Sequence, residues 1–319
     1  MSNVTQLSPG TWQISHPFLG EHEIVGSYLL EGRNELAIID PGPGSMVESL
    51  LASIREAGFD PEDVTHILAT HVHLDHAGAT GTLVRQMPGA HVYVHSKGAP
   101  HLLDTTKVVA SASRIYGDRM KLLWGAIEST PQERLHIIEG GDILNVAGRR
   151  LEVHYTPGHA VHHVIFFDVH SGELFAGDVA GVRLPGIDYV RPPTPPPDLD
   201  LEAWSESMNK VKSLRPDVLY IGHFGAVKNN IPEHFERLHE KLYAWGDFVL
   251  GAMRDGKDEG EIIAMLIEHT RPELLQVARD PHALERYEIA TNYPMTVQGY
   301  MRYWRKKHPE RLSPQFPLP

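Results

Sequence analysis

The sequence predicts an α/β fold followed by a helical C-terminal extension, and three observations support this prediction. Short apolar segments alternate with amphipathic helical segments over residues 1–230. Residues 231–319 contain amphipathic helical patterns and no clear strand pattern. Several apolar segments also end in a histidine or an aspartate, as strands do when a site is built at one rim of a sheet. We therefore expect one α/β domain and one helical extension, with the boundary near residue 230.

The N-terminal part is predicted to form strands that are joined by tight turns. Three segments are rich in branched and apolar residues, and Gly20 and the turn at 31–34 separate them, which gives expected strands at 11–15, 23–30 and 35–40. A helix is expected over 45–57, with Ser45 as its N-cap and Gly58 as its stop signal. The first unit is therefore strand, turn and helix.

The same alternation continues along the rest of the domain. A strand, a helix, a strand and a helical insertion are expected at residues 66–70, 77–87, 91–95 and 105–129. Further strands are expected at 135–138, 143–146, 150–155, 162–168, 173–177 and 217–221, with a helix at 201–214 before the last of them. The extension is predicted to contain helices at about 232–251, 258–270, 281–290 and 294–307.

Composition and charge limit the kinds of partner. The formal charge of −12 disfavours nucleic acid, because a polyanion is repelled unless a local basic patch overrides the mean charge. The chain has no cysteine, so disulfides, thiolate ligands and a cysteine nucleophile are excluded. No secretion signal and no run of about 18 apolar residues is present, so we expect a cytoplasmic protein that does not span a membrane.

The most informative motif is the run His71-Val72-His73-Leu74-Asp75-His76, in the loop after an expected strand. His71 and His73 are two residues apart and can point to the same side, while Asp75 and His76 can turn toward a neighbouring point. Imidazole nitrogen and carboxylate oxygen are ligands that zinc and similar divalent ions accept. The run therefore predicts a loop that binds metal, and its four donors are enough to take part in two metal sites.

Three further metal-competent side chains stand where other expected strands end. His159, Asp178 and His223 follow the strands at 150–155, 173–177 and 217–221. A carboxylate such as Asp178 can bridge two cations. Because these strand ends are expected at one rim of a sheet sandwich, we expect the three side chains to join the histidine run.

With these residues in view, the chain resembles the metallo-β-lactamase superfamily of hydrolases. The resemblance covers residues 1 to about 230 and lies in four motifs: His71-x-His73-x-Asp75-His76, Thr156-Pro157-Gly158-His159, Gly177-Asp178 and Gly222-His223. It implies an αββα sandwich, in which two mixed β-sheets lie face to face with helices outside. It also implies that Asp40, at the end of an early strand, orients the histidine loop.

The resemblance further implies a ligand set and a chemistry. One metal would be bound by His71, His73 and His159, the second by Asp75, His76 and His223, with Asp178 between them. A metal-bridging hydroxide would attack the substrate, and Asp75 would shuttle a proton. Zn²⁺ is the expected metal, with Fe, Mn and Co as alternatives that the same donors accept.

The ligand set favours some branches of this superfamily over others. A true β-lactamase is disfavoured, because Asp178 stands where several lactamases use a thiolate and a secretion signal is missing. The set resembles the lactonases, the glyoxalase II thioesterases and the phosphodiesterases, and the acidic charge argues against a tRNA substrate. Our first hypothesis is therefore a hydrolase of a small ester, lactone or thioester. The alternatives are a phosphodiesterase or phosphotriesterase, and a metal-binding or redox-sensing protein without hydrolysis.

Some side chains near these motifs keep two interpretations. Either one of His162 and His163 faces the site and supports the ligands, or both are surface or hydrogen-bonded histidines. Arg183 and Tyr189 either bind substrate from the loop after Asp178 or are exposed to solvent. The proline-rich segment 191–197 is interpreted as a stiff loop that shapes the mouth of the site. The apolar helical extension is a candidate wall of the substrate pocket or a contact in a homodimer.

Overall fold

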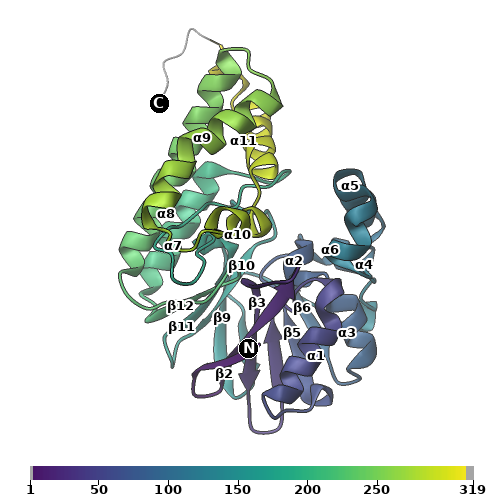
Figure 1. Ribbon diagram of the computed structural model, residues 1–319. Coiled ribbons are helices and arrows are strands. Elements are labelled where there is room, and N and C mark those ends of the chain that lie inside the picture. The colour runs from purple at the N-terminus through teal and green to yellow at the C-terminus, as the bar shows by residue number, and fades with distance from the viewer. Residues whose placement is uncertain (1–2, 314–319) are drawn as a thin grey trace.

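The computed structural model describes residues 3–313 and shows two β-sheets packed face to face, with helices on both outer sides (Figure 1). The first sheet has seven strands in sequential order, β1 (Val4–Ser8), β2 (Thr11–Phe18), β3 (Glu21–Glu31), β4 (Leu36–Ile39), β5 (Val64–Leu68), β6 (His91–His95) and β7 (Leu135–Ile138). Strands β1 to β4 pair antiparallel, and β4 to β7 pair parallel. This sheet is therefore mixed.

The second sheet has six strands in the order β13-β12-β11-β10-β9-β8. Their bounds are β8 (Ile143–Val146), β9 (Arg149–Tyr155), β10 (Val164–Asp168), β11 (Glu173–Gly177), β12 (Val218–Ile221) and β13 (Ala226–Val227). Only the pair β11 and β12 is parallel. Two mixed sheets with outer helices confirm the predicted αββα sandwich, and the C-terminal helices confirm the helical extension.

The helices fall into three groups. Those associated with the first sheet and the insertion after β6 are α1 (Val47–Glu56), α2 (Leu74–Ala77), α3 (Thr80–Gln86), α4 (Ala99–Leu103), α5 (Thr106–Tyr116) and α6 (Met120–Trp124). Helix α7 (Leu201–Leu214) covers the second sheet. The extension consists of α8 (Ile231–Arg254), α9 (Glu259–Val277), α10 (Ala283–Ala290) and α11 (Tyr293–Lys307). In Figure 1 the extension and the α5–α6 insertion rise on opposite sides of the sandwich.

Alternation along the strands explains the layers. In β3, Tyr28 and Leu30 face the core between the two sheets, while Leu29 faces the core under α1 and α3. Successive side chains of a strand point to opposite faces, so a strand that is buried on both faces is apolar at every position. Burial on both faces fixes the register of this central strand, because a slip by one residue would exchange the two cores.

The extension shares its hydrophobic core with the second sheet. Leu219 and Ile221 of β12, Trp204 of α7 and Leu238 of α8 belong to one cluster of buried side chains, which also includes Tyr300 of α11. Apolar burial of this kind holds the extension against the sandwich. The division at residue 230 stays a prediction, although the first long helix of the extension begins at Ile231.

Several local predictions differ from the structure. Ser45 does not cap a helix: it lies in a short 3-10 turn before α1, and its hydroxyl donates to the Leu123 carbonyl oxygen instead. The expected helix at 77–87 is two helices that begin at Leu74. Strand β1 was not predicted, because its residues alternate without strong apolar character. Helix α9 runs on to Val277 past Pro272.

Among residues 3–313, no helix is long and apolar enough to cross a membrane. The cytoplasmic location and the homodimer stay predictions from the sequence.

Candidate metal centre

The seven predicted ligands meet where four strands end. The loop that carries His71, His73, Asp75 and His76 follows β5. Asp178 directly follows β11, and His223 comes after β12, with Gly222 between them. His159 lies in the turn after β9. Two glycines allow the close approach: a Cβ at Gly222 would lie 2.4 Å from the His76 ring, and one at Gly177 would lie 2.6 Å from Thr70 Oγ1. Gly177 also has a φ of +50°, which glycine adopts readily.

Asp40 hydrogen-bonds the histidine loop, which is the role that the family resemblance implied for it. Its Oδ1 accepts from the Thr70 backbone N–H at 2.7 Å, and its Oδ2 accepts from Thr70 Oγ1 at 2.7 Å. Oδ2 also lies 3.0 Å from Nδ1 of His76. Asp40 is only 3% exposed, so water does not compete for these hydrogen bonds. Both carboxylate oxygens accept hydrogen bonds, which favours a supporting role for Asp40, although its ligand atom also lies within 4.8 Å of those of His71 and His76.

The hydrogen-bond partners of the rings determine which nitrogen faces the site. Thr70 gives its only hydroxyl proton to Asp40, so it must accept from Nδ1 of His71, 3.0 Å away. Nε2 of His71 then carries a lone pair, and this atom is buried without a hydrogen-bond partner. A lone pair directed into a buried site is what a metal ligand requires.

Three other rings are oriented in the same way. Nδ1 of His159 donates to the Pro193 carbonyl oxygen at 2.8 Å, and Nδ1 of His223 donates to the Ile24 carbonyl oxygen at 3.0 Å. Nδ1 of His76 faces Asp40, as described above. In each case Nε2 is left to face the other ligands, which is the usual arrangement of a histidine that binds metal.

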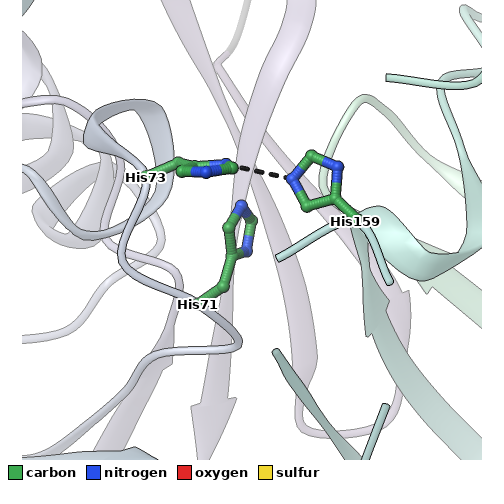
Figure 2. Close-up of side chains that lie close together, drawn as sticks. All are labelled: His71, His73 and His159. Atoms are coloured by element: carbon green, nitrogen blue, oxygen red, sulfur yellow. Dashed lines mark hydrogen bonds between the residues drawn. The ribbon is translucent and has the colours of Figure 1, made fainter. Parts of the chain in front are cut away.

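The ligand atoms of the predicted residues form two groups, and Asp40 forms a third group with His71 and His76. The nitrogen atoms of His71, His73 and His159 lie within 4.8 Å of one another, and the ligand atoms of Asp75, His76 and His223 do the same. In the first group, Nδ1 of His73 lies 3.0 Å from Nε2 of His159, and Figure 2 shows the three rings converging on one point. In the second, Nε2 of His223 lies 3.2 Å from Oδ2 of Asp75.

Asp178 stands between the two groups. Its Oδ2 lies 3.4 Å from Nε2 of His159, in the first group, and 3.7 Å from Nε2 of His223, in the second. Its Oδ1 lies 3.2 Å from Nε2 of His76. A single carboxylate thus reaches both groups, as a bridging ligand must.

The charges of the site suit divalent cations. Burial lowers the pKa of His71 well below its usual value and lowers that of His159 to about 4, so both rings are neutral near pH 7. Burial alone would raise the pKa of Asp178, but His76, His223 and His159 hold it well below its usual range. Burial also lowers the pKa of His76, yet Asp178 and Asp75 more than offset this and raise it.

The donor set therefore fits the divalent metal ions that this fold implies. It combines imidazole nitrogen with ionised carboxylate oxygen, which are donors for Zn²⁺, Fe²⁺, Mn²⁺ and Co²⁺ alike. Nε2 of His71 is buried without a hydrogen-bond partner, and a bound cation would satisfy its lone pair. The donors do not select one metal among these.

His162 and His163 both support the site from behind. Nε2 of His163 accepts from the Asp178 backbone N–H at 3.1 Å, and its Nδ1 lies 2.9 Å from Thr156 Oγ1. Nδ1 of His162 accepts from the backbone N–H of Val72 at 3.3 Å, within the histidine loop. Both rings hold the backbone that carries ligands, and they share no ligand group with the seven predicted residues.

The turn after Asp178 is held by helices that the sequence did not connect with the site. Nε1 of Trp204, on α7, donates to the Val179 carbonyl oxygen at 2.9 Å. Nε2 of His234, on α8, lies 2.7 Å from the Ala180 carbonyl oxygen. These contacts join residues 25 and 54 positions apart in the chain, so no local pattern could have revealed them. For Thr70, by contrast, the signal was its place directly before His71.

The loop after Asp178 differs from both sequence interpretations at Tyr189. Tyr189 is 1% exposed and packs beneath the Lys241 ammonium, whose Nζ lies 3.4 Å from the ring centroid. Solvent exposure is therefore wrong for Tyr189, and its ring is not free to bind a substrate. Arg183 is partly exposed and pairs with Asp188 at 3.1 Å.

Comparisons with known proteins agree with this geometry. The sequence profile described as "Metallo-beta-lactamase superfamily" matches residues 23–223. A metallo-beta-lactamase fold-containing protein from Sulfurisphaera tokodaii is 31% identical over 225 residues, which cover 69% of this chain and 80% of the relative. An atrochrysone carboxyl ACP thioesterase from Aspergillus fumigatus is 27% identical over 241 residues, 74% of this chain.

The fungal relative is matched over 62% of its length, so this chain spans less than two thirds of it. Among solved structures, a metallo-beta-lactamase family protein from Thermus thermophilus aligns with a TM-score of 0.70. The alignment covers 95% of both chains at 24% identity, and it therefore shows a common fold that includes the C-terminal helices.

Proposed function

The chain belongs to the metallo-β-lactamase superfamily, and from this premise we propose that it hydrolyses a small carboxylic ester, lactone or thioester with the help of two divalent cations. The observation that carries the proposal is the convergence of seven metal-competent side chains from four strand ends. The first cation would be held by His71, His73 and His159, the second by Asp75, His76 and His223, with Asp178 as the bridge. Zn²⁺ is the metal that we propose first.

Asp75 and Asp178 have different roles in the proposed reaction. Divalent cations at this site would lower the pKa of a coordinated water and polarise the carbonyl oxygen of the substrate. The Asp75 side chain is 23% exposed, whereas that of Asp178 is 3% exposed. Asp75 is therefore the carboxylate that faces the solvent side, and it is placed to accept the proton that the attacking water loses. Asp178, enclosed by three imidazoles, holds the two groups together.

Two observations support the ester, lactone and thioester class. The chain carries a formal charge of −12, which disfavours polyanionic substrates. The name of the Aspergillus relative is that of a thioesterase, and a relative from Emericella nidulans is also named a thioesterase. Within the proposed class, these names put thioesters first. The proposal thus keeps the lactonase and glyoxalase II-like branch that the ligand set resembles.

One screen of metal-analysed protein tests the proposal. We would measure metal content by elemental analysis and then compare hydrolysis of a thioester, a lactone, an aryl ester and a phosphodiester. We expect two equivalents of metal and a dominant rate on one of the first three substrates. A dominant rate on the phosphodiester would replace the proposal by a phosphodiesterase. Two bound metals with no hydrolysis in any arm would favour a metal-binding protein without this activity.

A further inference from the structure

A short segment connects the helical extension to the metal centre. We call residues 189–194 the strap, since they cross from the loop after Asp178 to the proline-rich turn. At one end of the strap, the Pro193 carbonyl oxygen accepts from Nδ1 of His159 at 2.8 Å. This bond fixes the plane and the tautomer of a proposed metal ligand. The position of Pro193 therefore decides how His159 points.

The extension grips the strap through one buried side chain. Arg191, two residues before Pro193, is only 1% exposed. Its Nη2 donates to Glu288 of α10 at 3.0 Å, and its guanidinium carbon lies 3.8 Å from the centroid of the Tyr293 ring on α11. The Trp245 ring of α8 lies 5.5 Å away. Helices α8, α10 and α11 thus enclose one arginine of the strap.

Other contacts hold the strap backbone in line with this grip. The Tyr287 hydroxyl donates to the Tyr189 carbonyl oxygen at 2.7 Å and accepts from the Leu184 N–H at 3.3 Å. Thr194 Oγ1 donates to the Thr296 carbonyl oxygen at 3.4 Å. The strap is therefore anchored to the extension on both sides of Arg191, while the Arg191 backbone also pairs with Val182.

The chemistry of Arg191 fits positioning better than stability. Nε and Nη1 of its guanidinium are buried without hydrogen-bond partners, and burying a charge with unmade hydrogen bonds costs free energy. Replacing a buried ion pair by apolar side chains is often neutral or stabilising. What the arginine adds is a planar group that the aromatic ring of Tyr293 and the carboxylate of Glu288 hold at a defined position.

We propose that Arg191 is a positioning residue through which the helical extension orients His159 and so sets the metal affinity of the group formed by His71, His73 and His159. The inference rests on the proposed function, because it takes two metal sites as its starting point. It also makes the two sites unequal: the group of Asp75, His76 and His223 has no contact with the strap among the hydrogen bonds described above.

The test is metal titration of the full-length protein after its metal has been removed. Co²⁺ would be added in competition with a chromophoric chelator, and its visible absorption would report the geometry at each site. We expect Arg191→Met to weaken one of two equivalents about tenfold, at the low end of the effect of losing an outer-shell partner. The other equivalent should stay unchanged, and Arg191→Lys should restore part of the lost affinity.

A matched control separates positioning from general loosening of the extension. Arg286 lies on α10, as Glu288 does. Its Nη2 donates to the His22 carbonyl oxygen of β3 at 3.2 Å, and it makes no hydrogen bond to the strap. Arg286→Ala should therefore leave both Co²⁺ affinities unchanged. Equal weakening by Arg286→Ala and Arg191→Met would overturn the proposal, as would unchanged affinities in Arg191→Met.

Two further outcomes complete the test. If Arg191→Met does not fold, Tyr287→Phe removes the hydroxyl that anchors the strap and should weaken the same equivalent, and a wild-type titration of that variant would contradict the proposal. If the wild-type protein binds fewer than two equivalents, the proposed function fails and this inference fails with it. Two wild-type equivalents with no effect at the strap would overturn this inference alone.

Discussion

The histidine loop takes its geometry chiefly from two adjacent strands of the first sheet, whereas His159, Asp178 and His223 depend on contacts with other elements of the fold. Thr70, directly before His71, ties the loop to Asp40 at the end of a neighbouring strand. His223 instead donates to a carbonyl oxygen 199 positions away, and the turn after Asp178 is bonded by α7 and α8. Half of the centre is thus built at the ends of two paired strands, and half is held by packing against other elements. The second half should therefore respond to changes in the extension.

The largest loss of metal affinity is expected at Asp178, which reaches both groups of ligands. Asp178→Asn keeps the shape of the side chain but removes the charge that reaches both groups. Because the loss of an outer partner already costs about 10–100-fold in metal affinity, we expect the loss of this bridge to exceed roughly 100-fold, with activity abolished. Metal analysis and steady-state kinetics would check this. Asp255→Asn, at an exposed carboxylate after α8, is the control, and full activity in Asp178→Asn would refute the bridging role.

A crowding change in the extension tests the half that is held by packing. A Cβ at Gly299 of α11 would lie 1.8 Å from the Thr194 carbonyl oxygen, so Gly299→Ala must displace the strap. We expect it to lower the free energy of unfolding by about 3 kcal/mol, near the upper end for overpacking. Gly251→Ala, in α8 with open space around the position, should cost nothing. Urea denaturation would measure the unfolding free energy of both variants. Equal values for Gly299→Ala and Gly251→Ala would contradict the close packing of the strap against α11.

A change at Asp40 tests the half that is built at the ends of the paired strands β4 and β5. Asp40→Asn removes the charge that orients Thr70 and His76, and we expect roughly 10–100-fold weaker metal binding. The folded state should survive, because the loop keeps its own backbone bonds. Chelator competition measures the affinity, with Asp60→Asn, at an exposed cap, as the control. Wild-type affinity in Asp40→Asn would show that the loop needs no support of this kind.

The last prediction concerns the pH dependence of the unfolding free energy. We expect a buried histidine in the first sheet and one in the extension to behave alike. Burial lowers the pKa of His16, which lies 2.7 Å from Ser27 in the first sheet, and that of His234 on α8, both to about 4. Between that value and the ordinary value of 6.5, the unfolded chain binds a proton that the folded chain does not. Each histidine thus costs stability as the pH falls below 6.5, roughly 2 kcal/mol by pH 5.

Paired variants measure this pH dependence. The unfolding free energy of the metal-free protein would be compared at pH 7 and pH 5 for the wild type, His16→Gln and His234→Gln. Each glutamine variant should lose less stability than the wild type over this range, since glutamine does not titrate. His170→Gln, at an exposed position, should follow the wild type. A wild-type pH dependence in both buried variants would mean that these rings are already protonated in the fold.

The sequence by itself determined the parts of this protein that depend on short-range patterns. Alternating apolar segments gave the strands, helical periodicity gave the extension, and the spacing within His71–His76 predicted a metal-binding loop. His159, Asp178 and His223 were found because each follows a strand, and strand ends gather at a sheet rim. Local patterns failed where a distant partner competed, as at Ser45, whose hydroxyl bonds Leu123 instead of capping a helix.

Tertiary structure alone decided how those parts act together. It determined which nitrogen of each ring faces the site, because the partners Thr70, Pro193 and Ile24 come from separate segments. It buried Tyr189 and Arg191 of the strap, although solvent exposure was one interpretation of Tyr189 from the sequence. Hydrogen bonds and burial depend on what lies nearby in space. Residues far apart in the chain therefore leave no trace of their contacts in a single sequence.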